Sequence, residues 1–247
     1  MFSRRFFLSA TTAFALAPKF ALANDEVPSL LDHILLGCND LDHGIAFFYQ
    51  HTGIHAVFGG VHPGRGTRNA LISLGEPRSY DLRPRRYLEI IAPDPEQPNA
   101  PDTYGLQRLS EPRLVTWAAH PGDIQALADR LAKAGIAAEG PTPGSRKRPD
   151  GQLLQWKTLN LKDTANGLLP FFIEWSANSE HPSIAAPKGC HLANFEALTP
   201  DPATLSRTAT LVLGLDLPIA KGDPPQLRAV ITSSKGKLAL TSWPDGF

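Results

Sequence analysis

Apolar and polar positions follow one arrangement that recurs three times along the chain. An apolar run suited to a strand precedes an aspartate that can cap a helix, a helix with one apolar face, and a glycine that ends the helix. The three strands are expected at residues 31–38, 113–119 and 190–198, and the three helices lie between Asp40 and Gly53, Asp123 and Gly135, and Asp201 and Gly214. Each glycine suits the left-handed backbone that follows a helix. The pattern therefore predicts three related strand–helix units.

Shorter strand-like segments complete each unit. After the helices we expect further strands at 56–58, 67–74 and 86–91 in the first unit, at 137–139, 153–161 and 170–175 in the second, and at 227–233 and 237–242 in the third. The fold class is therefore α+β, built from repeated βαβββ modules.

The domain boundaries follow from these units. Two full modules, at 29–95 and 112–178, form one domain over residues 29–178, and an abbreviated third unit occupies residues 188–247. This third unit has too few strands to bury both faces alone, so we expect it to pack on the first two.

The N-terminus has the three parts of an export signal. The charged segment Ser3-Arg4-Arg5-Phe6-Phe7-Leu8 precedes an apolar stretch, and Ala21-Leu22-Ala23 offers small residues for cleavage. The paired arginines are typical of the twin-arginine route. We therefore expect residues 1–23 to be a signal peptide and the protein to be periplasmic or secreted, with an uncleaved anchor as the alternative. The apolar stretch is shorter than the ~20 residues that span a bilayer, and no later segment is apolar enough to span one.

Composition excludes several classes of function. Lys plus Arg and Asp plus Glu number 24 each, so no basic surface indicates nucleic acid or acidic lipid as a partner. The chain contains no nucleophile elbow, phosphate-binding loop or dinucleotide fingerprint. Its two cysteines, Cys38 and Cys190, are too few for a disulfide framework and form either one bridge or two buried thiols. A homo-oligomer is neither indicated nor excluded.

Several motifs carry a resemblance to a known family. They are Leu31-Asp32-His33-Ile34, Gly59-Gly60 with His62-Pro63-Gly64, Gly66-Thr67-Arg68-Asn69, Tyr87-Leu88-Glu89-Ile90-Ile91, Arg148-Pro149-Asp150-Gly151 and Leu169–Trp175. Over residues 30–178 the chain resembles the vicinal oxygen chelate superfamily, in particular its glyoxalase-like domains. That superfamily includes isomerases, lyases, ring-cleaving dioxygenases, antibiotic-modifying enzymes and antibiotic-sequestering proteins. The resemblance implies that paired modules form a cup that holds one metal ion, with ligands from the first and last strands of each module.

Carried onto this sequence, the resemblance implies a metal site at His33, Glu89 and Glu174, with the two glutamates also catalytic. The fourth position should lie in residues 114–119, which offer only a threonine hydroxyl, so His62 or His120 would have to substitute. The residue types alone support a divalent ion such as Zn, Mn, Fe or Ni, because buried carboxylates are costly unless they are paired, hydrogen-bonded or bound to metal. A metal-free site and ordinary buried polar pairs remain alternatives.

Other side chains are candidates for contact with a substrate. They are His62, Arg68 and Asn69 around a glycine-rich loop, Trp117 at the empty ligand position, and Arg148 in a basic run on a turn. The alternatives are solvated arginines and a tryptophan in the core. The favoured function is a metal-dependent lyase, isomerase or dioxygenase that acts on a small oxygen-rich organic molecule. The alternative is a non-catalytic periplasmic protein that binds or sequesters a small molecule.

Overall fold

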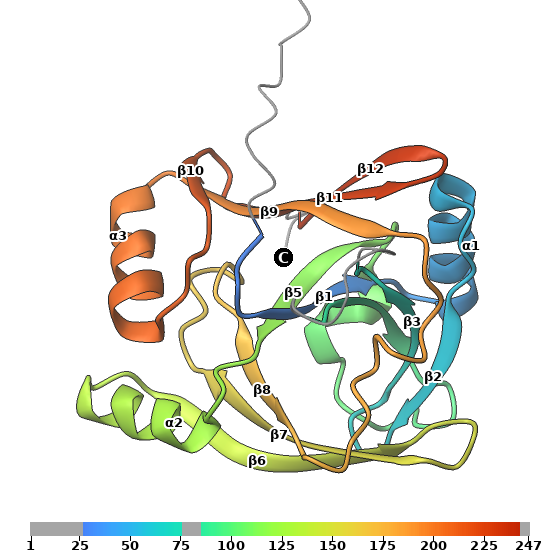
Figure 1. Ribbon diagram of the computed structural model, residues 1–247, viewed down its shortest axis with the longest axis horizontal. Helices are drawn as coiled ribbons and strands as arrows, with labels where there is room; N and C mark the ends of the chain where they lie inside the picture. The colour runs from blue at the N-terminus through green and yellow to red at the C-terminus, as the bar shows by residue number, and fades with distance from the viewer. Residues whose placement is uncertain (1–26, 76–84, 243–247) are drawn as a thin grey trace, which may run out of the picture.

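The computed structural model describes residues 27–75 and 85–242 (Figure 1), so the expected signal at residues 1–23 lies outside the described part. The strands are β1 (Leu31–Gly37), β2 (Val57–His62), β3 (Thr67–Ser73), β4 (Tyr87–Pro93), β5 (Arg113–Ala119), β6 (Ala138–Lys147), β7 (Leu153–Leu161), β8 (Phe171–Trp175), β9 (His191–Thr199), β10 (Ile219–Lys221), β11 (Gln226–Ser233) and β12 (Gly236–Thr241). The helices are α1 (Leu41–Thr52), η1 (Thr103–Arg108), α2 (Ile124–Lys133), α3 (Pro202–Arg207) and η2 (Thr208–Leu213).

The first two modules share one eight-stranded sheet in the order β2-β3-β4-β1-β5-β8-β7-β6. In each half the last strand runs parallel to the first, β4 beside β1 and β8 beside β5. The halves join through the antiparallel pair β1 and β5 at the centre. This arrangement confirms the predicted α+β class and its βαβββ modules.

The sheet curls until its two edge strands, β2 and β6, lie against each other. The side chain of Arg146 in β6 donates a hydrogen bond to the carbonyl oxygen of Gly59 in β2. A Cβ atom on Gly60 would lie only 2.8 Å from the carbonyl oxygen of Lys147. The concave face of the sheet is therefore enclosed on both sides.

Helices α1 and α2 begin at the capping aspartates that the sequence predicts, whereas the third expected helix, between Asp201 and Gly214, is divided into α3 and the π-helical segment η2. The Asp40 carboxylate accepts from the backbone N–H of His43 at 2.9 Å, and Asp123 does the same for Ala126 at 2.9 Å. After α1, Gly53 adopts the left-handed conformation at φ 75°. α1 packs on β3 and β4, and α2 packs on β6 and β7, so both helices cover the convex face of the sheet.

The third unit keeps the order of elements but changes their pairing. Its four-stranded sheet has the order β10-β9-β11-β12, so its first strand, β9, pairs with β10 and β11. In the first two modules the first strand pairs with the last. The unit is therefore related to the modules by element order and not by topology.

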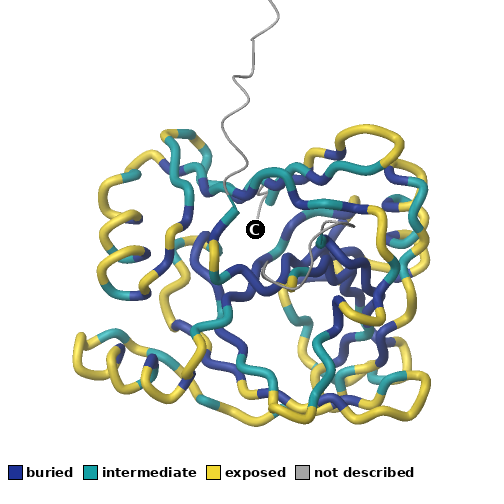
Figure 2. Tube along the Cα trace, in the orientation of Figure 1, coloured by how far each residue is buried: buried dark blue, intermediate teal, exposed yellow. Residues whose placement is uncertain are grey.

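One core joins the two sheets. Phe195 of β9 packs on Trp117 of β5, with 5.2 Å between the ring centroids, and both side chains are fully buried. Figure 2 shows the buried positions running through the centre and the exposed positions on the outer helices and loops. Cys38 and Cys190 are buried free thiols, the second of the two states expected for them. No helix in residues 27–75 and 85–242 is long and apolar enough to span a bilayer.

Candidate functional site

The concave face of the eight-stranded sheet contains a cavity of about 80 Å³, which we call the cup. Polar side chains from the first module line one side of it, namely His33, His62, Asn69 and Glu89. The second module contributes mainly apolar and aromatic side chains, namely Trp156, Phe171, Ile173 and Trp175. The cup therefore combines a small polar cluster with a largely apolar wall.

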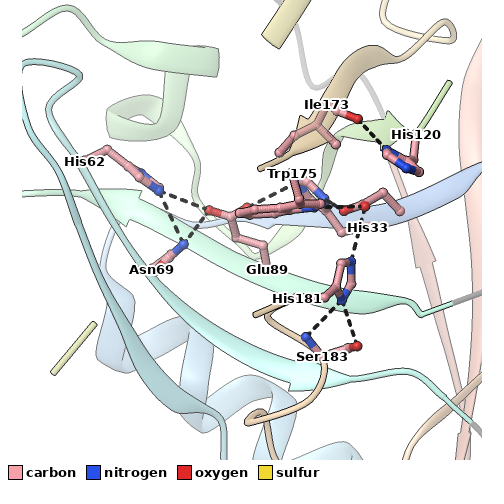
Figure 3. A network of polar contacts seen from close by, with 10 residues as sticks. His33, His62, Asn69, Glu89, His120, Ile173, Trp175, His181 and Ser183 are labelled. Carbon is pink, nitrogen blue, oxygen red and sulfur yellow. Dashed lines mark hydrogen bonds and ion pairs between the residues drawn. The ribbon is translucent and has the colours of Figure 1, made fainter. Parts of the chain in front are cut away.

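A bulge in β1 orients His33. Leu31 and His33 pair with the adjacent residues Ala119 and Ala118, so Asp32 is the extra residue of a bulge. As a result, the Asp32 carboxylate lies next to the imidazole of the following residue, His33, and accepts a hydrogen bond from its Nδ1 at 2.6 Å. The other nitrogen, Nε2, faces the cup and lies 3.5 Å from Glu89 Oε2 (Figure 3).

Two further donors hold the buried Asp32 carboxylate. Trp175 Nε1 donates to it at 3.1 Å, and His181 Nε2 lies at 3.2 Å. The backbone N–H of Ser183 donates to His181 Nδ1, which fixes the His181 proton on Nε2, toward Asp32. Burial alone would raise the pKa of Asp32, but the hydrogen bonds from His181 and His33 hold that pKa well below its usual range. Asp32 is therefore an ionised acceptor between two imidazoles.

Glu89 lies at the centre of the polar cluster. Asn69 Nδ2 donates to Glu89 Oε1 at 2.7 Å, and His62 Nε2 lies 3.8 Å from the same oxygen. Burial lowers the pKa of His62, an effect that the Glu89 charge opposes and the Arg146 charge reinforces. The structure thus brings His33, His62, Asn69 and Glu89 together, and Asn69 positions Glu89 through a direct hydrogen bond.

Arg146 is a cup residue that the sequence analysis missed. The run at residues 145–148 was expected on a turn, but β6 continues through Lys147 and leaves Arg146 only 4% exposed. It lines the cup, and it forms no ion pair with any carboxylate in the described part of the chain. Burial lowers its pKa, and the charge on Glu89 opposes this. A buried cation without a paired anion is costly, so this position favours binding of an anionic ligand.

The prediction that Glu174 joins His33 and Glu89 is wrong. Successive residues of a strand face opposite sides, and in β8 it is Ile173 and Trp175 that face the cup. Glu174 lies on the convex face, where its carboxylate accepts from the backbone N–H of Ile124 at 2.8 Å. It satisfies a free N–H group at the start of α2.

Three predicted substrate contacts also lie elsewhere. Arg68 is absent from the described lining of the cup, because its neighbours Thr67 and Asn69 are the residues of β3 that face inward. Trp117 belongs to the core and donates through Nε1 to the carbonyl oxygen of Leu168 at 2.9 Å. Arg148 is paired with Glu180 at 2.7 Å, outside the cup.

The residues of the cup do not fit the implied metal ion. Of the three predicted ligands, only His33 and Glu89 line the cup, and the second module adds mainly apolar residues at the facing positions. His62, the other expected substitute, does line the cup, with Nε2 3.8 Å from Glu89 Oε1. His120 does not replace the lost ligand, since its Nδ1 lies 2.9 Å from the carbonyl oxygen of Ile173 and it does not line the cup. The described residues contain no group of three or more His, Cys, Asp or Glu side chains that could hold a metal. The buried charge of Arg146 would in addition repel a divalent cation near Glu89.

This donor set predicts the outcome of a metal analysis. Protein purified without a chelator should contain far less than one equivalent of Zn, Mn, Fe or Ni by mass spectrometry, because the described residues contain no group of three His, Cys, Asp or Glu side chains arranged to hold such an ion, and the Arg146 guanidinium lines the same cup. Dialysis against a chelator should leave ligand binding unchanged. A stoichiometric ion whose removal abolishes ligand binding would contradict our assignment of the cup.

Comparisons with known proteins agree with this fold. A family model described as "Glyoxalase-like domain" matches residues 31–212. A solved hypothetical protein from Staphylococcus aureus is similar with a TM-score of 0.58 and 16% identity, covering 85% of this chain and 84% of the other. Methylmalonyl-CoA epimerase from Streptomyces coelicolor follows at a TM-score of 0.45 and 19% identity, over 62% of this chain and 99% of the other. The Mycobacterium tuberculosis epimerase has a TM-score of 0.41 and 22% identity, over 60% and 89%. No curated protein matches the sequence.

Proposed function

Given that the chain belongs to the glyoxalase-like domain family, we propose that it is an enzyme that moves a proton on a small organic anion, by isomerase- or lyase-type chemistry. One observation carries this proposal. The Glu89 carboxylate lies 3.5 Å from an imidazole that Asp32 orients, in a cup that is also lined by Arg146, a guanidinium with no carboxylate partner among the described residues. A base, a second proton carrier and an anion-binding group are thus within one small space.

Each group has a distinct role in this proposal. Arg146 binds an oxyanion of the substrate and stabilises the negative charge that develops when a carbon beside a carbonyl loses its proton. Glu89 accepts that proton, and Asn69 fixes the carboxylate through the hydrogen bond to Oε1. His33 presents Nε2 to the same region, because Asp32 holds its Nδ1–H, so it can exchange a proton with the substrate or with Glu89.

We do not extend the proposal to a dioxygenase. That reaction type was expected together with a metal site at His33, Glu89 and Glu174, and Glu174 lies on the other face of the sheet. Proton transfer needs only groups that line the cup. The proposal therefore covers the isomerase and lyase types and assigns no metal.

Exchange of carbon-bound protons with solvent provides a direct test. The protein is incubated in D₂O with a panel of small 2-oxo and 2-hydroxy carboxylates, and proton NMR follows the signal of the hydrogen beside the carbonyl or carboxylate. We expect catalysed loss of this signal for at least one member of the panel. If members of the panel bind but none exchanges, the protein is the non-catalytic binding protein that the sequence left as the alternative.

We also propose that the protein acts outside the cytoplasm after twin-arginine export, a proposal that rests on the sequence of residues 1–23. Mass spectrometry of exported protein should show a chain that begins at Asn24. Changing Arg4 and Arg5 to Lys should retain the precursor in the cytoplasm. Normal export of that double variant would contradict the twin-arginine route.

A further inference from the structure

A second cavity, of about 200 Å³, shares one wall residue with the cup. Arg146 lines both cavities. The second cavity also lies on the concave face, because Leu71 is the cross-strand partner of Glu89 and Leu154 is two residues from Trp156 on β7. The side chain of Arg146 therefore forms the boundary between a polar cup and a second cavity.

The second cavity has the opposite chemistry to the cup. Its walls are mainly apolar, from Val57, Phe58, Leu71, Leu154, Pro182 and Ala186. Val57 and Phe58 are 45% and 44% exposed at its rim, so apolar surface is left open to solvent where it leads into the cavity. Two charged residues also reach it, Arg148 and Asp150, and these form an ion pair at 2.9 Å.

The guanidinium of Arg146 retains donors for a ligand at this boundary. Nη1 donates to the carbonyl oxygen of Gly59, which anchors the side chain between β6 and β2. An arginine has five N–H donors in a planar fork that matches a carboxylate, and the described part of the chain supplies no carboxylate ion pair to this one. A carboxylate bound there would have the cup on one side and the apolar cavity on the other.

We propose that the second cavity holds the apolar substituent of the substrate, so that the substrate class is a carboxylate with a ring-sized or branched hydrocarbon group. This inference rests on the proposed function, because it takes Arg146 as the group that binds the substrate's oxyanion. The size is consistent, since a cavity of about 150 Å³ accommodates benzene. The carboxylate and the adjacent carbon lie at the cup, near Glu89, and the hydrocarbon displaces water from Leu71, Leu154 and Phe58.

Calorimetric titration with a series of simple carboxylates tests this inference without any need for turnover. The probes are propionate, valerate, hexanoate and phenylacetate. Affinity should rise about fourfold for each added methylene, because burial of a methylene is favourable by about 0.8 kcal/mol. Phenylacetate should bind far more tightly than propionate.

Phenylalanine substitutions at two neighbouring residues test whether the gain in affinity depends on the second cavity. Ala185 is exposed and lines the second cavity, so Ala185→Phe should fill it and lower phenylacetate affinity by about tenfold or more, while propionate affinity changes little. Ile184 is also exposed but does not line the cavity, so Ile184→Phe is the matched control and should behave as wild type. Circular dichroism of both variants establishes that they are folded.

The outcomes separate the two proposals. A flat affinity series, absence of binding by every probe, or equal effects of Ala185→Phe and Ile184→Phe would each overturn the cavity assignment. A rising series that Ala185→Phe abolishes, combined with no proton exchange on any 2-oxo or 2-hydroxy acid, would support the cavity while refuting the enzyme.

Discussion

Replacement of Glu89 by glutamine should lower the rate of substrate proton exchange by about 10²- to 10⁴-fold, the usual contribution of a general base. The amide has nearly the same shape, and its oxygen can still accept from Asn69 Nδ2, so the cup should keep its geometry. What the variant loses is the group that accepts the proton, 3.5 Å from His33 Nε2. Exchange in D₂O followed by NMR measures the loss, and hexanoate titration shows whether binding persists.

Glu174→Gln provides the matched control for this experiment. It makes the same change in the equivalent strand of the second module, but on the convex face, where Glu174 accepts from Ile124 N–H at 2.8 Å. We expect an exchange rate within about twofold of wild type, as for most substitutions away from a site. Unfolding should become easier by only about 0.3–1 kcal/mol, since a carboxylate leaves a helix N-terminus. Equal loss of exchange in the two variants would contradict the placement of the active site.

Asp32→Asn should lower proton exchange by about 10²- to 10³-fold, because a carboxylate that orients a histidine controls which of its nitrogens carries the proton. Asp32 accepts hydrogen bonds from His33, His181 and Trp175. An asparagine has one acceptor oxygen and an NH₂ group, so at least one of these donors would face another donor. His33 could then flip its tautomer and turn an N–H toward Glu89.

The same variant should change the pH dependence of stability. In the folded protein the pKa of Asp32 is held well below its usual range, so its stabilising contribution is present above the unfolded value near 4 and is lost as the pH falls toward the folded pKa. The free energy of unfolding, measured by urea denaturation, should therefore fall more steeply below about pH 4 in wild type than in Asp32→Asn. For the exchange rate, Asp94→Asn is the control, because Asp94 is about as buried as Asp32 but accepts its side-chain hydrogen bond from Gln97 instead of from His33. A wild-type exchange rate in Asp32→Asn would contradict the role of Asp32.

Strands and helices whose bounds are set by residues close in sequence could be predicted from the sequence. The two strands at residues 113–119 and 153–161 have the bounds that the pattern gave them, and α1 lies between its capping Asp40 and the left-handed Gly53. In each case short-range effects, namely alternation and capping, determine the bounds.

The failure at Glu174 came from a register error of one residue. The closing strands share a sequence pattern of an aromatic residue, an aliphatic residue and a glutamate, in Tyr87-Leu88-Glu89 and Phe172-Ile173-Glu174, which predicts equivalent positions for the two glutamates. In β4 this pattern places Glu89 inward, but in β8 the inward positions are Ile173 and Trp175. Because side chains alternate, a shift of one residue moves every side chain to the other face.

Arg146 and His181 were missed for different reasons. The strand expected at residues 137–139 continues in the structure to Lys147, past Pro141 and Pro143, because β6 is the edge of the sheet, where missing N–H donors are tolerated. His181 lies in the connection between β8 and β9 and reaches Asp32, 149 residues earlier in the chain. No local pattern encodes such a contact.

The closure of β2 against β6 also changes how far the edges of the sheet are available to other chains. A sheet of eight strands has two edges, and unpaired edge strands can recruit a strand from another chain. Here both edges turn toward each other, Arg146 reaches across to Gly59, and two prolines in β6 remove N–H donors. The curvature that encloses the cup thus also withdraws the largest sheet from intermolecular strand pairing, which protects against amyloid-like aggregation. A variant that opened this seam would expose hydrogen-bonding edges as well as the ligand site.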